Sequence, residues 1–396
     1  MKRIIAGILV LILSFSIVAS AELLQEESPY LTGEEFFDWV IPASGTALDT
    51  TADGALLMEA ETGKVLFEKN PDKKMPIASV TKIMTLLLTM EALDNGVISL
   101  DEMVTVSENA ASMGGSQAWM EPGENLSVHE MLKAVVVSSC NDGAVALAEH
   151  IAGSEAEFIN RMNIRAEELG MKNTTFVNCT GLDDNEMHMS SARDVALMSQ
   201  ELIRHKKIFE YTSIWTDTIR NGAFGLSNTN KLIRFYNGAN GLKTGSTSKA
   251  KFCLSATAKR GDVQFIAVVL GAPSSAERFS DAKSLLDYGF ANYAIYHPDA
   301  LSVEKIHVTG GKENFAKISA ETNPVIVKKG TESKIVSEIT LSEKISAPVD
   351  MGQTVGEIVY KNGDEVISRV KIKTTEAVEK TDFLDIFIKL LKSIVM

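Results

Sequence analysis

The order of apolar and polar residues divides the chain into four parts. A basic start and an apolar run occupy residues 1–21, and a long region after them mixes strand-like and helix-like patterns up to His297-Pro298. Beyond that point, runs rich in Val, Ile, Thr and Lys alternate apolar with polar positions, which is the period of strands. A short amphipathic stretch, 380–396, ends the chain. The pattern therefore predicts a mixed domain, a small all-β domain and a terminal helix.

The mixed region is expected to form one sheet with helices packed on it. Apolar runs at 55–58 and 65–67 flank a turn and predict a hairpin, and the runs 252–258 and 263–270 predict two adjacent strands. Strands at both ends with helices between them are typical of an α/β or α+β domain, to which we assign residues 22–298. The predicted helices cover 77 to near Asp94, 127–137, 141–152, 154–169, 191–204 and 276–293, and two short strands are predicted at 216–220 and 231–235.

Residues 299–375 are predicted to form a small β-sandwich-like domain, since Asn362-Gly363 between two strand-like runs is a strong hairpin signal. In 380–396, charged residues fall on one narrow helical face and apolar residues cover the rest. This stretch is too short to span a bilayer, and it suits a helix lying in the membrane interface. A helix docked on the protein's own surface or on another subunit is the alternative.

The N-terminal run predicts export from the cytoplasm. Lys2 and Arg3 precede an apolar stretch that ends in Ala19-Ser20-Ala21, which is the pattern of a cleaved secretory signal peptide. A membrane-spanning anchor is the alternative, but it needs about 20 apolar residues. We therefore expect the mature protein to begin at Glu22 and to work outside the cytoplasmic membrane.

Composition and charge exclude several classes of function. The formal net charge of −13 makes the chain a poor partner for nucleic acids. Three cysteines, Cys140, Cys179 and Cys253, are too few for a disulfide framework in a secreted chain of 396 residues. The six histidines show no His-x-x-x-His or His-Cys spacing. We therefore expect neither a metal ion nor another cofactor.

The segment 77–90 carries the clearest chemical signal. It is apolar almost all round at a helical period, so the helix is expected to be buried, yet it contains Lys82. Burial lowers the pKa of a lysine, and one helical turn would place its amine beside the hydroxyl of Ser79. A neutral amine next to a hydroxyl is a general base next to a nucleophile. The alternative is that Ser79 caps the helix and Lys82 reaches water, because the Ser-x-x-Lys spacing also occurs at five other places.

Two further motifs follow along the chain. Ser139-Cys140-Asn141 lies between two predicted helices, and Lys243-Thr244-Gly245 precedes the strand at 252–258. The succession Ser-x-x-Lys, Ser-x-Asn and Lys-Thr-Gly is shared by penicillin-binding proteins and class A β-lactamases. With its signal segment, trailing β domain and terminal helix, the chain resembles the low-molecular-mass penicillin-binding proteins that are serine-type D-alanyl-D-alanine carboxypeptidases. The resemblance implies a catalytic domain of the serine β-lactamase and penicillin-binding-protein fold.

The resemblance also implies the reaction and its nucleophile. Ser79 would attack the carbonyl carbon of the penultimate D-alanine of a peptidoglycan stem peptide and form an acyl-enzyme, with Lys82 taking the serine's proton. Ser139 would relay a proton to the leaving D-alanine, and Asn141 would hold the side chain of Lys82 and the substrate amide. β-Lactams would acylate the same serine. The enzyme would act on the outer face of the cytoplasmic membrane, facing the cell wall.

The third motif is expected to bind the substrate. Lys243, with the hydroxyl of Thr244 or Ser246, would bind the terminal carboxylate and help to lower the pKa of the buried lysine. Gly245 would let the substrate backbone approach the strand edge, which suits recognition by strand addition. By resemblance, the oxyanion hole consists of the backbone N–H groups of Ser79 and Ser246.

Several alternatives stand beside this interpretation. Ser139 and Asn141 would cap the following helix, and Lys243-Thr244-Gly245 would be a plain turn, if no active site existed. Arg278 could orient the substrate carboxylate, but we favour a solvated helix arginine. Cys140 is interpreted as a tolerated small residue between two active-site residues. For the whole protein the alternatives are a β-lactamase or a transpeptidase on the same scaffold, and a non-catalytic wall-binding protein.

Overall fold

The computed structural model describes residues 48–182, 186–299, 301, 303–383 and 387. The predicted signal peptide, 1–21, and most of the predicted terminal helix, 380–396, lie outside these described residues. Among the helices that the structure describes, none is long and apolar enough to cross a membrane.

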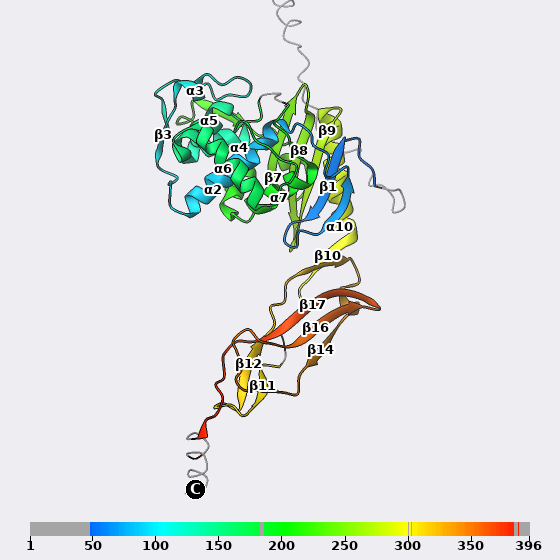
Figure 1. Cartoon of the computed structure of the whole chain (residues 1–396). Helices are drawn as coiled ribbons and strands as arrows, with labels where there is room; N and C mark the ends of the chain where they lie inside the picture. Colours follow the sequence, from blue (N-terminus) through cyan, green and yellow to red (C-terminus); the bar gives the residue numbers. More distant parts are fainter. Residues whose placement is uncertain (1–47, 183–185, 300, 302, 384–386, 388–396) are drawn as a thin grey trace, which may run out of the picture. The chain divides into compact units, whose positions relative to one another are not determined.

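A five-stranded antiparallel sheet with the order β2-β1-β9-β8-β7 forms the centre of the α/β domain (Figure 1). The predicted hairpin and the predicted pair of adjacent strands are confirmed as β1–β2 and β8–β9. Strand β7, which the sequence did not predict, forms one edge of the sheet. The strands span Gly54–Glu59 (β1), Val65–Lys69 (β2), Ala239–Thr247 (β7), Lys251–Arg260 (β8) and Val263–Ala272 (β9).

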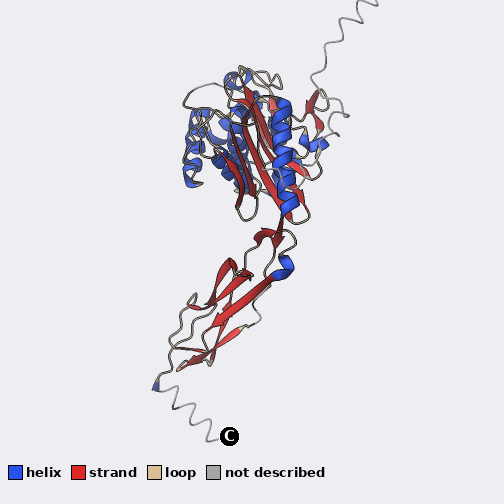
Figure 2. Ribbon diagram, turned by 90° about the vertical axis from the view of Figure 1, so that its right-hand side faces the viewer, coloured by secondary structure: helices blue, strands red, loops and turns tan. Residues whose placement is uncertain are grey.

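Both faces of this sheet are covered, which explains why its inner strands are apolar throughout. Successive side chains of a strand point to opposite faces, so in β9 Ile266 and Val268 enter one hydrophobic core while Phe265 and Val269 enter another. One long helix, α10 (Ser275–Asn292), covers the second core, and the remaining large helices pack on the other face (Figure 2). The other helical segments are η2 (Ala78–Thr81), α2 (Lys82–Asp94), α3 (Glu108–Ala111), α4 (Val128–Val137), α5 (Asn141–Ala152), α6 (Glu155–Glu168), α7 (Ala192–Leu202), η3 (Lys206–Ile208), α8 (Phe209–Thr212) and α9 (Leu232–Phe235).

The predicted strand at 231–235 is wrong, because Leu232–Phe235 is the short helix α9. Asn230 starts this turn by accepting a hydrogen bond from the backbone N–H of Leu232 at 3.2 Å. A short apolar run does not distinguish a strand from a buried helical turn, and here a local side-chain acceptor decides for the helix. Two small two-stranded sheets complete the domain: β3 (Met103–Thr105) with β4 (Asn125–Ser127), and β5 (Thr216–Ile219) with β6 (Phe224–Ser227).

An all-β domain follows the α/β domain and has a hydrophobic core of its own. Its six-stranded sheet has the order β14-β16-β17-β12-β11-β15. The predicted hairpin at Asn362-Gly363 is confirmed, since Asn362 pairs with Glu365 and Gly363 has a φ of 60°. The strands are β11 (Lys305–Thr309), β12 (Phe315–Ser319), β14 (Ile335–Leu341), β15 (Lys344–Ser346), β16 (Thr354–Asn362) and β17 (Glu365–Thr374); β10 (Tyr293–Tyr296) pairs with β13 (Val325–Lys328), and η4 covers Glu332–Lys334.

Candidate active site

The first motif lies where a 3-10 turn runs into helix α2. Ser79 is part of η2 and partly exposed, while Lys82 begins α2 and is fully buried. The Nζ atom of Lys82 lies 3.1 Å from Oγ of Ser79. Neither end of the turn is capped by a side chain, and the lysine does not reach water. The alternative in which Ser79 caps the helix and Lys82 reaches water is therefore wrong.

Two carbonyl oxygens hold the amine of Lys82 from its other sides. Nζ donates to Oδ1 of Asn141 at 2.5 Å and to the backbone oxygen of Thr180 at 3.0 Å. Burial lowers the pKa of Lys82 to about 8, because the interior solvates its charged form poorly. Sequence reasoning missed Thr180, since any residue type can present a backbone carbonyl.

The second motif lies between α4 and α5, within reach of the same lysine. Ser139 is buried, has a positive φ of 63°, and its Oγ has no hydrogen-bond partner within the described part of the chain. Helix α5 has Cys140 as its N-cap residue and no side-chain cap bond, so Ser139 and Asn141 do not serve as caps. Burial raises the pKa of the Cys140 thiol to about 12, which leaves it a neutral small side chain.

Backbone carbonyls of a loop before α4 bind both the side chain and the backbone of Asn141. The carbonyl of Gly114 accepts from Nδ2 of Asn141 at 2.6 Å, and the carbonyl of Ser116 accepts from its backbone N–H at 2.7 Å. Because Nδ2 donates to Gly114, the amide is oriented with Oδ1 toward Lys82. The orientation of this amide therefore depends on the loop at 114–116.

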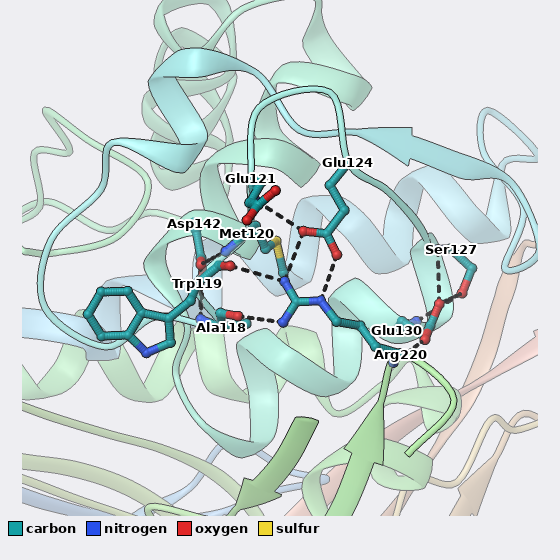
Figure 3. Close-up of polar contacts among 9 residues, drawn as sticks. All are labelled: Ala118, Trp119, Met120, Glu121, Glu124, Ser127, Glu130, Asp142 and Arg220. Carbon is teal, nitrogen blue, oxygen red and sulfur yellow. Dashed lines mark hydrogen bonds and ion pairs between the residues drawn. The ribbon is translucent and has the colours of Figure 1, made fainter. Parts of the chain in front are cut away.

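The next part of the same loop is anchored by two charged residues (Figure 3). The carboxylate of Asp142 accepts hydrogen bonds from the N–H groups of Ala118 and Met120, and Arg220 donates to the carbonyl of Ala118 at 2.7 Å. Arg220 also forms an ion pair with Glu124, 2.6 Å away, which lowers the pKa of that carboxyl. The sequence did not indicate this network, because its members come from separate segments of the chain.

The third motif lies on the edge strand β7, beside the first. Thr244 and Lys243 are buried, Ser246 is exposed, and Oγ1 of Thr244 donates to Oγ1 of Thr229 at 2.7 Å. A Cβ atom on Gly245 would lie 2.9 Å from the backbone nitrogen of Ser79, closer than real Cβ contacts allow. Only glycine lets β7 pass so close to the turn that carries the serine.

The structure therefore brings the three motifs into one site. Lys243 donates to the carbonyl of Thr244 at 3.1 Å. Its pKa lies well below the ordinary range because of burial first, and then because of the positive charges of Lys82 and Arg278. The alternative in which Lys243-Thr244-Gly245 is a plain turn is wrong, since these residues are paired with β8.

Arg278 is not the solvated helix arginine that we favoured from the sequence. It lies on the face of α10 that packs on the sheet, and it is only 6% exposed. Its Nη1 donates to the carbonyls of Gly245 and Cys253, each at 3.3 Å, while its Nε has no partner among the described residues. Burial lowers its pKa to about 10. A buried guanidinium thus lies against the strand that carries the third motif, held by neutral groups.

Two models of known protein families match the chain, one over most of the α/β domain and one over the all-β domain. Residues 42–274 match the model of the D-alanyl-D-alanine carboxypeptidase family, and residues 290–380 match that of the penicillin-binding protein 5 C-terminal domain. The D-alanyl-D-alanine carboxypeptidase DacF of Bacillus subtilis is 44% identical over 84% of this chain and 87% of its own. DacC of Escherichia coli is 35% identical over 83% of this chain and 84% of its own.

Solved structures agree with these similarities. Penicillin-binding protein 5 from Haemophilus influenzae superimposes with a TM-score of 0.77 at 31% identity, covering 85% of this chain and 99% of that one. The ampicillin-bound form of penicillin-binding protein D2 from Listeria monocytogenes has a TM-score of 0.55 at 37% identity, covering 62% of this chain and all of that one.

Proposed function

The chain belongs to the D-alanyl-D-alanine carboxypeptidase family of serine peptidases, and we propose that Ser79 is the nucleophile of this enzyme. The observation that carries the proposal is the fully buried Lys82 amine 3.1 Å from the partly exposed hydroxyl of Ser79. The enzyme acts on peptidoglycan as a penicillin-binding protein. The geometry of the site supports the following roles for its residues.

Lys82 acts as the general base in its neutral form. A neutral amine has two N–H groups and one lone pair. The oxygens of Asn141 and Thr180 can only accept, so they engage the two N–H groups. The lone pair is then left to face the hydroxyl of Ser79, which donates its proton.

In acylation, a C–O bond to Ser79 replaces the C–N bond at the carbonyl carbon of the substrate. Oγ of Ser79 forms a bond to the carbonyl carbon of the penultimate D-alanine as its proton passes to Lys82. The C–N bond to the terminal D-alanine then breaks, and the leaving amine takes up that proton through the hydroxyl of Ser139. The Oγ of Ser139 has no hydrogen-bond partner among the described residues, which supports this relay because no bond within the described protein competes for its proton. Water later cleaves the ester and restores Ser79.

The terminal carboxylate of the substrate is bound beside β7. Lys243, Thr244 and Arg278 supply two cations and a hydroxyl, and no carboxylate of the protein neutralises Arg278 through its described hydrogen bonds. An arriving carboxylate raises the depressed pKa of Lys243, so that lysine binds the substrate as a cation. This in turn favours the neutral form of Lys82, because two adjacent buried ammonium groups repel each other.

The substrate backbone adds along β7, the edge strand of the sheet, and Gly245 lets this strand lie directly against the serine turn. We assign the oxyanion hole to the backbone N–H groups of Ser79 and Ser246, which is supported by the close approach of β7 to the serine turn. Donors fixed before reaction stabilise the developing negative charge without reorganisation.

The organisation of the whole chain is part of the proposal. We propose a signal peptide at 1–21, a catalytic domain at 22–298, a small β-sandwich-like domain at 299–375 and a membrane-associating helix at 380–396. The composition of the two terminal segments supports an enzyme held at the outer face of the cytoplasmic membrane. Removing residues 380–396 should release the enzyme from the membrane fraction of cells; a variant that stays membrane-bound would contradict the role of this helix.

A penicillin adduct tests the catalytic assignment directly. The protein from Glu22 onward and its Ser79→Ala variant are incubated with a fluorescent penicillin and analysed by peptide mass spectrometry. We expect a long-lived adduct on Ser79 in the wild type and none in the variant. Rapid loss of the adduct would indicate a β-lactamase, and the absence of any adduct on a folded wild-type protein would refute the nucleophile.

A further inference from the structure

A buried histidine links the two backbone segments that meet at Lys82. His188 is 2% exposed, and its Nε2 lies 2.7 Å from Oγ1 of Thr81, the residue before Lys82. Its Nδ1 accepts a hydrogen bond from the backbone N–H of Val177 at 3.2 Å. Because Nδ1 accepts, Nε2 carries the proton of the neutral ring and donates to Thr81. The ring therefore makes two directed hydrogen bonds to different parts of the site.

Val177 lies three residues before Thr180, whose backbone carbonyl accepts the hydrogen bond from Lys82. Oδ1 of Asn178 accepts from the N–H groups of Thr180 and Gly181, at 3.1 and 2.6 Å. This local turn directs the carbonyl of Thr180 toward Nζ of Lys82. Val177 immediately precedes the turn, so His188 is hydrogen-bonded to the residue from which the turn starts.

The loop and the serine turn are in close backbone contact. A Cβ on Gly181 would lie 1.9 Å from the carbonyl oxygen of Ala78, beside Ser79. Besides the bond from Lys82 to Thr180, two further described side-chain links hold the loop at this contact: His188 reaches Thr81, and Oγ1 of Thr85 donates to the carbonyl of Cys179 at 2.6 Å. The link through His188 is the one that joins the loop to η2, which carries the nucleophile.

We propose that His188 is a positioning residue for acylation, which keeps the carbonyl of Thr180 aimed at the amine of Lys82. The inference rests on the proposed role of Lys82 as the base for Ser79. With both carbonyl acceptors in place, the amine presents its lone pair to the serine. Without His188 the loop shifts relative to the turn, Thr180 ceases to fix one N–H group, and the lone pair is no longer directed at Ser79.

The consequence is a slower chemical step with little change in binding. His188 touches neither the edge of β7 nor the residues that we assign to the substrate carboxylate, through any described hydrogen bond. Misplacement of a reacting group by about 1 Å can slow a reaction about 100-fold. We therefore expect a fall of about 10- to 100-fold in the acylation rate constant, with an unchanged dissociation constant for the non-covalent complex.

The experiment compares His188→Ala, His188→Gln and Thr81→Val in the protein from Glu22 onward. Each is mixed with a fluorescent penicillin by stopped flow, the acylation rate constant is expressed per titrated active site, and kcat and KM are measured on a D-Ala-D-Ala peptide. Glutamine keeps one donor and one acceptor, so it should restore the rate to within a few-fold of the wild type. Thr81→Val removes the acceptor alone and should slow acylation without a large cavity. His129→Ala is the matched control, because His129 contacts Tyr211 at 2.9 Å and is not part of the link.

The outcomes separate this inference from the proposed function. If His188→Ala and Thr81→Val acylate at the wild-type rate per active site, even with lowered stability, the positioning role is wrong. If both slow acylation and the double variant is no slower than His188→Ala, the two residues act through one link. Should His188→Ala not fold, Thr81→Val alone decides. A wild-type protein without an adduct on Ser79 would instead overturn the nucleophile, and this inference with it.

Discussion

Acylation of Ser79 should depend on pH with a midpoint near 8, set by Lys82. Burial lowers the pKa of this lysine to about 8. At pH 7 about a tenth of such an amine is neutral, whereas a lysine with the ordinary pKa of about 10.4 is neutral in about one molecule in 2,500. Burial therefore raises the neutral fraction of Lys82 at pH 7 on the order of 200-fold. This corresponds to a free-energy penalty of about 3 kcal/mol for the charged form in the buried site.

The assay is the second-order rate constant of acylation by a fluorescent penicillin between pH 5.5 and 9.5, since it reports the pKa of the free enzyme. The base works when neutral, so the rate should fall about tenfold for each pH unit below the midpoint and level off above it. The active-site concentration at each pH is measured by titration, which controls for unfolding. A rate that is independent of pH from 6 to 9, or one that still rises tenfold per unit at pH 9.5, would refute a neutral Lys82 as the base.

The same shift predicts a stability difference with a definite sign. Between about pH 8 and 10.4 the unfolded chain holds the proton of Lys82 and the folded chain does not, so stability increases with pH across this window. Urea unfolding of the wild type and of Lys82→Met isolates this group. The stability of the wild type relative to the variant should rise by up to about 3 kcal/mol from pH 8 to 10.4; no rise would mean that the folded pKa is not depressed.

Three further predictions concern residues around the same site. Gly245→Ala places a Cβ against the serine turn, so it should lower the acylation rate about 100-fold while circular dichroism shows a folded protein; wild-type acylation would contradict the close approach. Arg278→Gln should raise KM for a D-Ala-D-Ala peptide about 10- to 100-fold, the effect of losing a hydrogen bond from a buried charge, and an effect on kcat alone would argue against carboxylate binding. The thiols of Cys140, Cys179 and Cys253 are buried with raised pKa values, so iodoacetamide at pH 8 should label none in the native protein and all three after unfolding, as counted by mass spectrometry.

Most helices and strands could be predicted from the sequence, because hydrophobic spacing and turn residues act within a short segment of the chain. The apolar runs of β1 and β9 predicted buried strands, and α4, α5 and α10 lie close to their predicted bounds. The helix predicted from residue 77 begins instead as the 3-10 turn η2 and continues as α2. The run 231–235 is predicted as a strand but forms a helix, because five residues are too few to show a period. Strand β7 was also missed, although it carries the third motif.

The candidate site was recognisable for a different reason. Ser79, Lys82, Ser139, Asn141 and Lys243-Thr244-Gly245 are side chains or glycines of specific types in a specific order, so their identities can be found in the sequence alone. The structure then brings them together: Lys82 contacts Asn141, and Gly245 lies against the serine turn.

Other features of the site depended on tertiary structure alone. The carbonyl of Thr180 has no residue signature, and His188 joins segments that are distant in sequence. Arg278 is buried although the sequence favours a solvated position, because an arginine in a helical pattern does not show which face of the helix meets the sheet. The sequence by itself determined which chemical groups this protein contains and their order along the chain. Tertiary structure decided which of them are buried and which backbone atoms they contact, because burial and contact depend on how distant segments pack.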